Sequence, residues 1–424
     1  MIIPTKSLLD HRIVQLEQAV DAGDTGALDD FWKAVTAEGA PLMEPIEGDE
    51  TRTLVTFLWR DPGDTDNVLV LFYSAPTHEA SLAEYQMERL PGTDLWYKTY
   101  LLPSDLRTTY LFSVNDSLVP FASYTDVLAR IPSCRTDPLN PLDYTIFGNP
   151  NEFRVSVLEL PQAPRQPWGI ARRGVPKGKN HMHLIESKIL QTQQHVSVYL
   201  PPGYRTDGEA YDVLVLFDGW AYFNFAATPT VLDNLLYAGR IPPFVLVMHT
   251  NMDQAVRARE LPCHEPFGDF LAQEMMPFLH ENYHITSDPA KTIVGGSCFG
   301  GLAAAFVAFR RPEIFGNVIS QSGSFWWPEK ETPETEMEWL TDQFEQSPKL
   351  PIRFAMEVGS LEAAIVEFDQ LKTNRRLRDV LLSKGYEVDY AEYSGGHDMI
   401  CWRGSLVNRL LALAGTKKPL PTSK

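Results

Sequence analysis

The sequence predicts two domains: a helical segment with a small β-sandwich, followed by an α/β domain with a mostly parallel sheet. Three observations carry this prediction. The chain has 424 residues, more than one ordinary hydrophobic core supports. Short β-branched and aromatic runs begin near residue 51, whereas strand-like and helix-like segments alternate from about residue 181. A stretch rich in proline, asparagine and arginine separates the two patterns.

Residues 5–37 carry apolar side chains near helical spacing with a break at Gly23, so we expect two amphipathic helices. The runs TLVTFLWRD, NVLVLFYSA, LWYKTYLL and TTYLFSVND then predict a sandwich of roughly 100 residues. We therefore assign residues 1–150 to the helical segment and sandwich, 151–180 to a linker, and 181–415 to the α/β domain.

The α/β domain opens with the strand-like runs HVSVYLPPGY and DVLVLFDGW. The second is an unbroken apolar run, typical of a strand buried on both faces of a parallel sheet. Later strands are expected at FVLVMHTN, KTIVGGS, NVISQSG, RFAMEVG and VDYAEY, with helices between them. Strands that alternate with helices in this way indicate a mostly parallel sheet.

Composition indicates a soluble globular protein, with 44% hydrophobic and 22% charged residues. No apolar run approaches the roughly 18 residues that a membrane helix needs, and the N-terminus does not resemble a signal peptide. The formal net charge of −18 argues against nucleic acid and anionic membranes as partners.

The four cysteines (Cys134, Cys263, Cys298, Cys401) lie far apart, without a CxxC pair or zinc-ligand spacing. We read them as thiols in a reducing compartment and expect a cytoplasmic protein. No metal site, phosphate loop or dinucleotide fingerprint is recognisable, so no cofactor is expected.

The segment TIVGGSCFGGLAAAF carries the main chemical signal: an apolar strand, a glycine-rich turn and an alanine-rich helix. It matches the nucleophile elbow, G-x-nucleophile-x-G, of the α/β-hydrolase fold. With Ser297 as nucleophile the second glycine position would hold Phe299, whereas Cys298 is flanked at the right spacing by Gly296 and Gly300. The spacing therefore favours Cys298.

A general base is expected after a late strand of such a domain. His397 follows the strand VDYAEY and a pair of glycines, and His264 is the one rival we retain. A carboxylate that orients the base should follow the strand RFAMEVG. Glu362 fits that loop, with Glu357 and Asp369 as alternatives.

Two backbone N–H groups should form an oxyanion hole. One belongs to Phe299, the residue after the proposed nucleophile. The other should come from the loop after the strand VLVLF, where Gly219 permits the turn and Trp220 supplies the N–H.

Four further side chains are candidates for substrate binding: Arg257, Arg259, Trp326 and Trp327. The two arginines could form a local basic pocket on an otherwise acidic chain. The tandem tryptophans follow a strand end, where they could stack on a flat aromatic acyl group or pack at a domain interface. For Trp327 we favour packing.

The segments LFDGW, RARELPC, GSCFGGLAA, RRPEIFGNVISQSGSFWWP and GGHDMICWRG resemble, in this order, the signatures of the enterochelin (enterobactin) esterase family. FLWRDP, ERLPGTDLW, DPLNP and ELPQAP resemble that family's N-terminal domain. The resemblance implies an N-terminal sandwich that helps cover the site, and a serine, a histidine and an acid at Cys298, His397 and near Glu362. It also implies a catecholate trilactone siderophore as substrate, with or without iron, cut at serine ester bonds.

Two positions depart from the family pattern: cysteine stands in the serine position, and Leu361 stands where arginine is expected. We therefore keep three hypotheses. The first is hydrolysis of an ester or lactone of a siderophore or related nonribosomal peptide through a thioester on Cys298. The second is transfer of an acyl group to an amine, hydroxyl or thiol, with a carrier protein as a possible partner, because thioesters react readily with such acceptors. The third is a non-catalytic binding protein on a hydrolase scaffold.

Overall fold

The computed structural model describes residues 3–4, 9–72, 79–122, 126, 129–146, 153–328, 337–363 and 368–416. The chain divides into two compact units, each assembled from three stretches. The first unit consists of Met1–Pro164, Ser360–Phe368 and Ser394–Ile400. The second consists of Arg165–Gly359, Asp369–Tyr393 and Cys401–Lys424.

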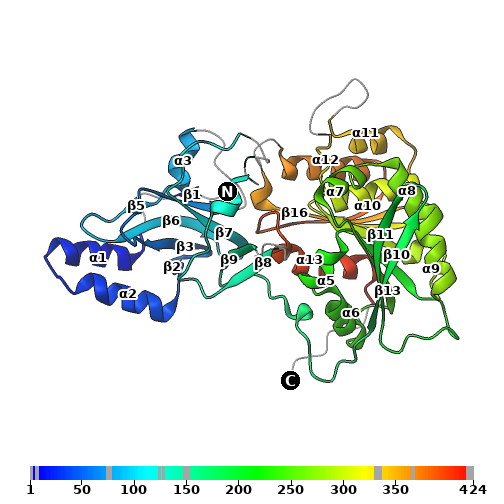
Figure 1. Ribbon diagram of the computed structural model, residues 1–424, viewed down its shortest axis with the longest axis horizontal. Helices are drawn as coiled ribbons and strands as arrows, with labels where there is room; N and C mark the ends of the chain where they lie inside the picture. Colours follow the sequence, from blue (N-terminus) through cyan, green and yellow to red (C-terminus); the bar gives the residue numbers. More distant parts are fainter. Residues whose placement is uncertain are drawn as a thin grey trace. The chain divides into compact units, whose positions relative to one another are not determined.

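The first unit contains two antiparallel sheets with helices beside them, drawn in blue and cyan in Figure 1. One sheet has the order β1-β6-β3-β2, with β5 paired to β6, and the other has the order β4-β7-β9-β8. The elements are β1 (Ile3–Pro4), α1 (His11–Asp21), α2 (Ala27–Glu38), β2 (Leu42–Ile46), β3 (Asp49–Arg60), β4 (Val68–Phe72), α3 (Glu79–Tyr85), β5 (Glu88–Arg89), β6 (Leu95–Pro103), β7 (Arg107–Val114), β8 (Asp143–Ile146) and β9 (Phe153–Glu159).

The two sheets share one apolar core and therefore form a sandwich. Phe57 of β3 and Tyr100 of β6 meet Tyr110 and Phe112 of β7, with ring centres of Phe57 and Tyr110 4.8 Å apart. Large aromatic side chains that meet edge to face fill such a layer efficiently. A second cluster packs α1 and α2 against β2, β3 and β6 through residues such as Ile13 and Trp32.

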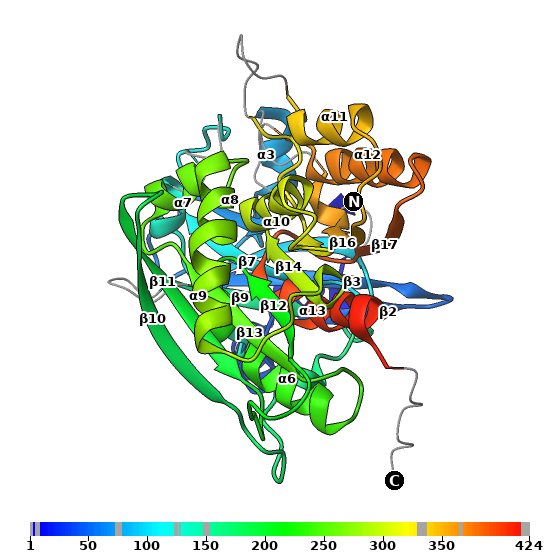
Figure 2. The same ribbon diagram turned by 90° about the vertical axis from the view of Figure 1, so that its right-hand side faces the viewer.

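The second unit is an eight-stranded sheet with the order β10-β11-β13-β12-β14-β15-β16-β17, flanked by helices. Figure 2 shows β12, β13 and β14 side by side in this sheet. The strands are β10 (Lys179–Ser187), β11 (Thr192–Leu200), β12 (Asp212–Leu216), β13 (Phe244–Thr250), β14 (Thr292–Ser297), β15 (Asn317–Gln321), β16 (Arg353–Gly359) and β17 (Glu387–Tyr393). The helices are α5 (Gly219–Asn224), α6 (Thr228–Tyr237), α7 (Gln254–Glu260), α8 (Glu265–Phe270), α9 (Met276–Asn282), α10 (Phe299–Arg310), α11 (Trp339–Gln346), α12 (Gln370–Ser383) and α13 (Met399–Ala414).

Every neighbouring pair from β13 to β17 is parallel, whereas β10 and β11 are antiparallel. Parallel strands bring their carboxyl ends to one edge of the sheet, which is where ligands bind in open α/β sheets. The segments that leave β12, β14, β15, β16 and β17 therefore all start at that edge.

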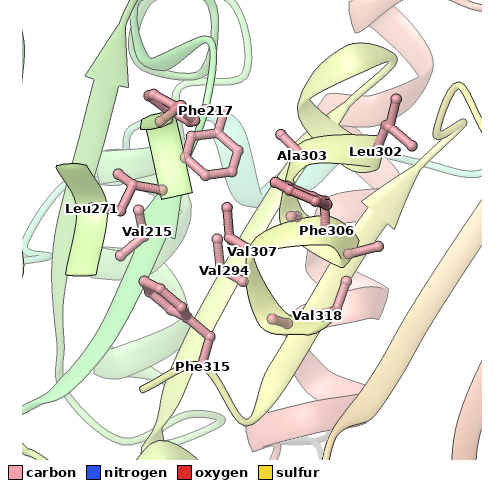
Figure 3. Close-up of a cluster of buried hydrophobic side chains, with 14 of the residues drawn as sticks. Val215, Phe217, Leu271, Val294, Leu302, Ala303, Phe306, Val307, Phe315 and Val318 are labelled. Atoms are coloured by element: carbon pink, nitrogen blue, oxygen red, sulfur yellow. The ribbon is translucent and has the colours of Figure 1, made fainter. Parts of the chain in front are cut away.

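The core of the second unit lies between this sheet and α10 (Figure 3). Val215, Val294 and Val318 of three adjacent strands face Phe306 and Val307 of the helix. All five side chains are buried, which explains why the strand runs are apolar throughout and why α10 is rich in alanine. This packing fixes α10 against β14 and thereby fixes the turn between them.

The predicted fold class is confirmed, both for the helical segment with its sandwich and for the mostly parallel sheet. Residues 5–8, the start of the first predicted helix, lie outside the described residues. The segment 151–180, predicted as a linker, contains β9, which pairs with β7 and β8 because FRVSVLE is a β-branched run between more polar stretches. Within the described ranges, no helix has the length and apolar character needed to cross a bilayer.

Candidate active site

Cys298 occupies the turn between β14 and α10. Its backbone has φ 56° and ψ −124°, a conformation that is costly for a residue with a side chain. The Cys298 carbonyl accepts hydrogen bonds from the N–H groups of Gly301 and Leu302, each at 3.1 Å, and the Cys298 N–H donates to the Gln321 carbonyl at 3.1 Å. A strained strand-to-helix turn of this kind exposes the side chain at its tip.

Glycine is required at position 296 because the chain nearly touches itself across this turn. A Cβ atom on Gly296 would lie 2.7 Å from the carbonyl carbon of Gly300 and 2.9 Å from its Cα. No real Cβ tolerates such a contact with backbone. The spacing that pointed to Cys298 therefore has a steric cause.

Ser297, the alternative in the sequence, lies in a different environment. It is the last residue of β14, is 3% exposed, and its hydroxyl interacts with that of Tyr222. Tyr222 in turn donates to the Gln321 side-chain oxygen at 2.7 Å. Ser297 is thus part of a buried polar network, and Cys298 is the residue at the turn.

The surroundings of the Cys298 thiol are polar and include a partly buried cation. Its Sγ lies 3.4 Å from the Ser324 hydroxyl. Arg257 of α7 forms a two-point ion pair with Asp218, with Nε and Nη2 each 2.6 Å from a carboxylate oxygen. Burial disfavours the charged form of Arg257, but attraction to Asp218 and to the Cys298 sulfur outweighs it and raises the pKa of Arg257.

The loop predicted to supply the second oxyanion-hole N–H is a tight turn after β12. Asp218 has the left-handed backbone angles φ 55° and ψ 41°, and α5 begins at Gly219. A Cβ on Gly219 would lie 2.6 Å from Met248 Cβ, so the loop is pressed against β13. Trp220 is the second residue of α5 and Phe299 the first of α10, so the N–H group of each lies in the first turn of a helix.

In the first unit, the structure brings His397 and Glu362 together. His397 Nδ1 lies 2.6 Å from Glu362 Oε2, and Glu362 is fully buried. The loop segments that carry them are joined by a hydrogen bond of 3.0 Å from the Leu361 N–H to the Gly395 carbonyl. A carboxylate in this position fixes the tautomer of the imidazole and leaves Nε2 as the nitrogen that can accept a proton.

The two alternative acids have other partners. Glu357 accepts a hydrogen bond from the Gln321 amide at 2.6 Å and lies 3.3 Å from Arg409. Asp369 caps α12 by accepting from the Lys372 N–H at 2.8 Å. The rival base, His264, precedes α8 as its N-cap residue, and burial lowers its pKa.

Comparisons with known proteins agree with this architecture along nearly the whole chain. A family model described as putative esterase matches residues 187–413, and one described as enterochelin esterase, N-terminal, matches residues 54–169. An iron(III) enterobactin esterase of Escherichia coli O6:H1 is 30% identical over 376 residues, covering 85% of this chain and 90% of the relative. An iron(III) salmochelin esterase of the same strain is 28% identical over 421 residues, covering 95% and 98%. The crystal structure of an enterobactin esterase from Shigella flexneri in the presence of enterobactin matches with a TM-score of 0.71 at 27% identity, covering 91% of this chain and 97% of that one.

The chain belongs to the enterochelin esterase family. The resemblance inferred from the sequence motifs is thereby confirmed, and an esterase architecture is established for the chain. In this chain, Cys298 belongs to the second unit, whereas His397 and Glu362 belong to the first.

The four side chains that the sequence predicts to bind substrate lie in different surroundings. Arg257 is held by Asp218 next to the turn, and its guanidinium lies 5.7 Å from the centre of the Phe299 ring. Arg259 extends toward solvent and pairs with the buried Glu260 at 2.9 Å. Of the four, Arg257 is thus the one whose interaction with Cys298 is evident.

The tandem tryptophans are largely packed. Trp326 is 8% exposed, donates from its indole nitrogen to the Gln370 side chain at 2.5 Å, and has its ring centre 5.7 Å from that of Phe299. Trp327 is half-buried and meets Trp339 edge to face at 6.2 Å. Trp326 therefore borders the turn through Phe299, and Trp327 packs against the core of its own unit.

Two residues near Cys298 were not singled out from the sequence of this esterase. Asp218 precedes Gly219 in the loop predicted to supply an oxyanion-hole N–H, and its charge beside a glycine turn could have been matched with a cation. Ser324, in the segment SGSFWW, carried no signal, because serine is common in loops and its proximity to Cys298 depends on the parallel pairing of β14 with β15.

Proposed function

We propose that this chain hydrolyses the ester bonds of a catecholate trilactone siderophore, free or as its iron(III) complex, through an acyl-enzyme on Cys298. The observation that carries the proposal is the strained turn at Cys298 in a member of the enterochelin esterase family. Relatives named as iron(III) enterobactin and salmochelin esterases support the substrate class, as does a related structure obtained in the presence of enterobactin.

In the first step, the Cys298 sulfur attacks the ester carbonyl carbon and His397 takes the thiol proton. A C–S bond forms, and the carbonyl π electrons become an oxyanion that the N–H groups of Phe299 and Trp220 stabilise. When the oxyanion collapses, the C–O ester bond breaks, and the protonated His397 returns the proton to the leaving serine hydroxyl. The products are an opened lactone, attached as a thioester.

In the second step, water attacks the thioester carbonyl and His397 accepts a proton from it. Collapse of the second oxyanion breaks the C–S bond, the sulfur leaves as thiolate, and the carboxylic acid is released. Glu362 stabilises the imidazolium form of His397 in both steps. Arg257 contributes a fixed positive charge near the sulfur, which favours the thiolate.

Acyl transfer is the second candidate function, and the cysteine itself favours it. A thioester exchanges readily with amines and thiols, so an acceptor that reaches the site faster than water would divert the acyl group. In that case a carrier protein could be the acyl donor. The two functions share the first step and differ in the molecule that accepts the acyl group from Cys298: water in hydrolysis, and an amine, hydroxyl or thiol in transfer.

The test is covalent trapping followed by acceptor competition. The protein is incubated with an activated aryl ester and its intact mass is recorded, with Cys298→Ala and the matched variant Ser297→Ala alongside. We expect a mass gain in the wild type and in Ser297→Ala, and none in Cys298→Ala. An adduct that survives Cys298→Ala and disappears in Ser297→Ala would overturn the assignment of the nucleophile.

Acceptors are then supplied in turn to the acylated protein. Loss of the adduct in buffer alone, with release of the free acid, supports hydrolysis, and loss only with an amine or thiol supports transfer. The substrate class is tested by incubating the protein with a catecholate trilactone and monitoring its opening to the linear form by chromatography. An intact trilactone after incubation with protein that hydrolyses simple esters would contradict the siderophore assignment.

A further inference from the structure

The loop that carries His397 lies beside a strand of the N-terminal sandwich. β4 ends at Phe72, opposite Tyr110 of β7. Closer to the start of β7, Arg107 forms a parallel bridge with Gly395, and the Arg107 N–H donates to the Ser394 carbonyl at 3.1 Å. The loop thus takes the position of a neighbouring strand along the first residues of β7.

A second anchor follows His397 directly. The Asp398 side chain is buried, and its Oδ2 accepts hydrogen bonds from the Thr109 hydroxyl at 3.1 Å and from the Thr109 N–H at 3.3 Å. Its Oδ1 accepts from the Ile400 N–H at 2.9 Å, which caps the start of α13. Both carboxylate oxygens of Asp398 are therefore used, one on β7 and one on the helix.

The two anchors enclose the imidazole-bearing residue. Arg107 holds the chain three residues before His397, and Thr109 holds it one residue after. The Glu362 segment joins the same assembly, because the Leu361 N–H bonds to Gly395 and the Leu361 side chain lies in the sandwich core together with residues such as Phe57.

We propose that β7 positions His397, with Thr109 and Asp398 as the positioning residues. The proposal rests on the proposed function, in which His397 is the base. A buried carboxylate is destabilised when a hydrogen-bond donor is removed, because water cannot replace the lost bond. Without the Thr109 hydroxyl, Asp398 would move toward another donor and would take the adjacent His397 with it. A displacement of about 1 Å at a reacting group can reduce a rate by about 10²-fold.

The experiment compares Thr109→Val with Thr109→Ser and with the matched control Thr108→Val. Thr108 is also fully buried on β7, but its hydroxyl bonds to the Thr109 carbonyl and not to Asp398. We measure kcat and KM for an activated aryl ester, the thermal unfolding midpoint, and the rate at which iodoacetamide alkylates Cys298.

We expect Thr109→Val to lower kcat by about 10- to 100-fold with little change in KM, because the base is displaced and the turn at Cys298 is not. Thr109→Ser should recover most of this activity, and Thr108→Val should resemble the wild type. Alkylation of Cys298 should proceed at similar rates in all three variants, which shows that the second unit is intact.

The proposal is overturned if Thr109→Val has the same kcat as Thr108→Val, or if serine at position 109 restores nothing. Asp398→Asn gives a second route to the same answer, because it keeps the shape and removes the charge. His397→Ala, measured alongside, separates the two levels of inference. If that variant retains turnover, His397 is not the base and the proposed function fails as well. If it is inactive while Thr109→Val is normal, only the positioning by β7 is wrong.

Discussion

Replacing Glu362 with glutamine tests the acid–base pair with the least change in shape. The side-chain volume is preserved, and the amide oxygen can still accept a hydrogen bond from His397 Nδ1. In the wild-type structure this nitrogen lies 2.6 Å from the Glu362 carboxylate. What is lost is the negative charge that stabilises the imidazolium. With charge centres about 4 Å apart and an effective dielectric constant near 20, this attraction is worth about 4 kcal/mol. At about 1.4 kcal/mol per tenfold change, the acylation rate should fall by about 10³-fold.

Acylation is followed under single-turnover conditions as the release of aryl alcohol from an activated ester. Asp369→Asn serves as the matched control, since Asp369 is a carboxylate that caps α12. Asparagine also caps helices, so this variant should acylate at the wild-type rate. A Glu362→Gln protein that acylates within about threefold of the wild type would refute the reasoning, as would a large effect of Asp369→Asn.

Two further predictions concern stability. Gly296→Ala places a Cβ 2.7 Å from the Gly300 carbonyl carbon, so the free energy of unfolding in urea should fall by about 1–3 kcal/mol. The rate at which Cys298 is alkylated should also change. Wild-type values for both would contradict the steric account. His249 is fully buried, and burial lowers its pKa from 6.5 to about 4. Between these pH values the unfolded chain binds a proton that the folded chain does not, so stability should fall by about 1.4 kcal/mol per pH unit on acidification. Unfolding at pH 7 and pH 5 should show a smaller difference in His249→Gln than in the wild type, and equal differences would assign the pH dependence to other groups.

The parts of the site that the sequence predicts are those with a local steric cause. The spacing of Gly296 and Gly300 around Cys298 reflects a contact within five residues, so it can be read directly from the chain. The alternation of apolar strands and helices is similarly local, because each strand is buried on both faces and each helix covers it.

The parts that could not be predicted depend on contacts between distant segments. Three carboxylates were candidates for the partner of His397, and the choice of Glu362 follows from a loop-to-loop bond between Leu361 and Gly395. The ion pair of Arg257 with Asp218 joins residues 39 positions apart. β9 was overlooked because its seven residues lie in a segment whose average composition is that of a linker.

The assembly of the first unit from three stretches has a consequence for the newly made chain. Its last stretch ends at Ile400, so this unit cannot be complete until residue 400 has been synthesised. The turn at Cys298 is made about 100 residues before His397, an interval of roughly 5–20 s at ordinary translation rates. During that interval the nascent protein carries its thiol without the acid–base pair that the proposed mechanism requires. The proposed chemistry therefore cannot begin until the segment that carries His397 has been made.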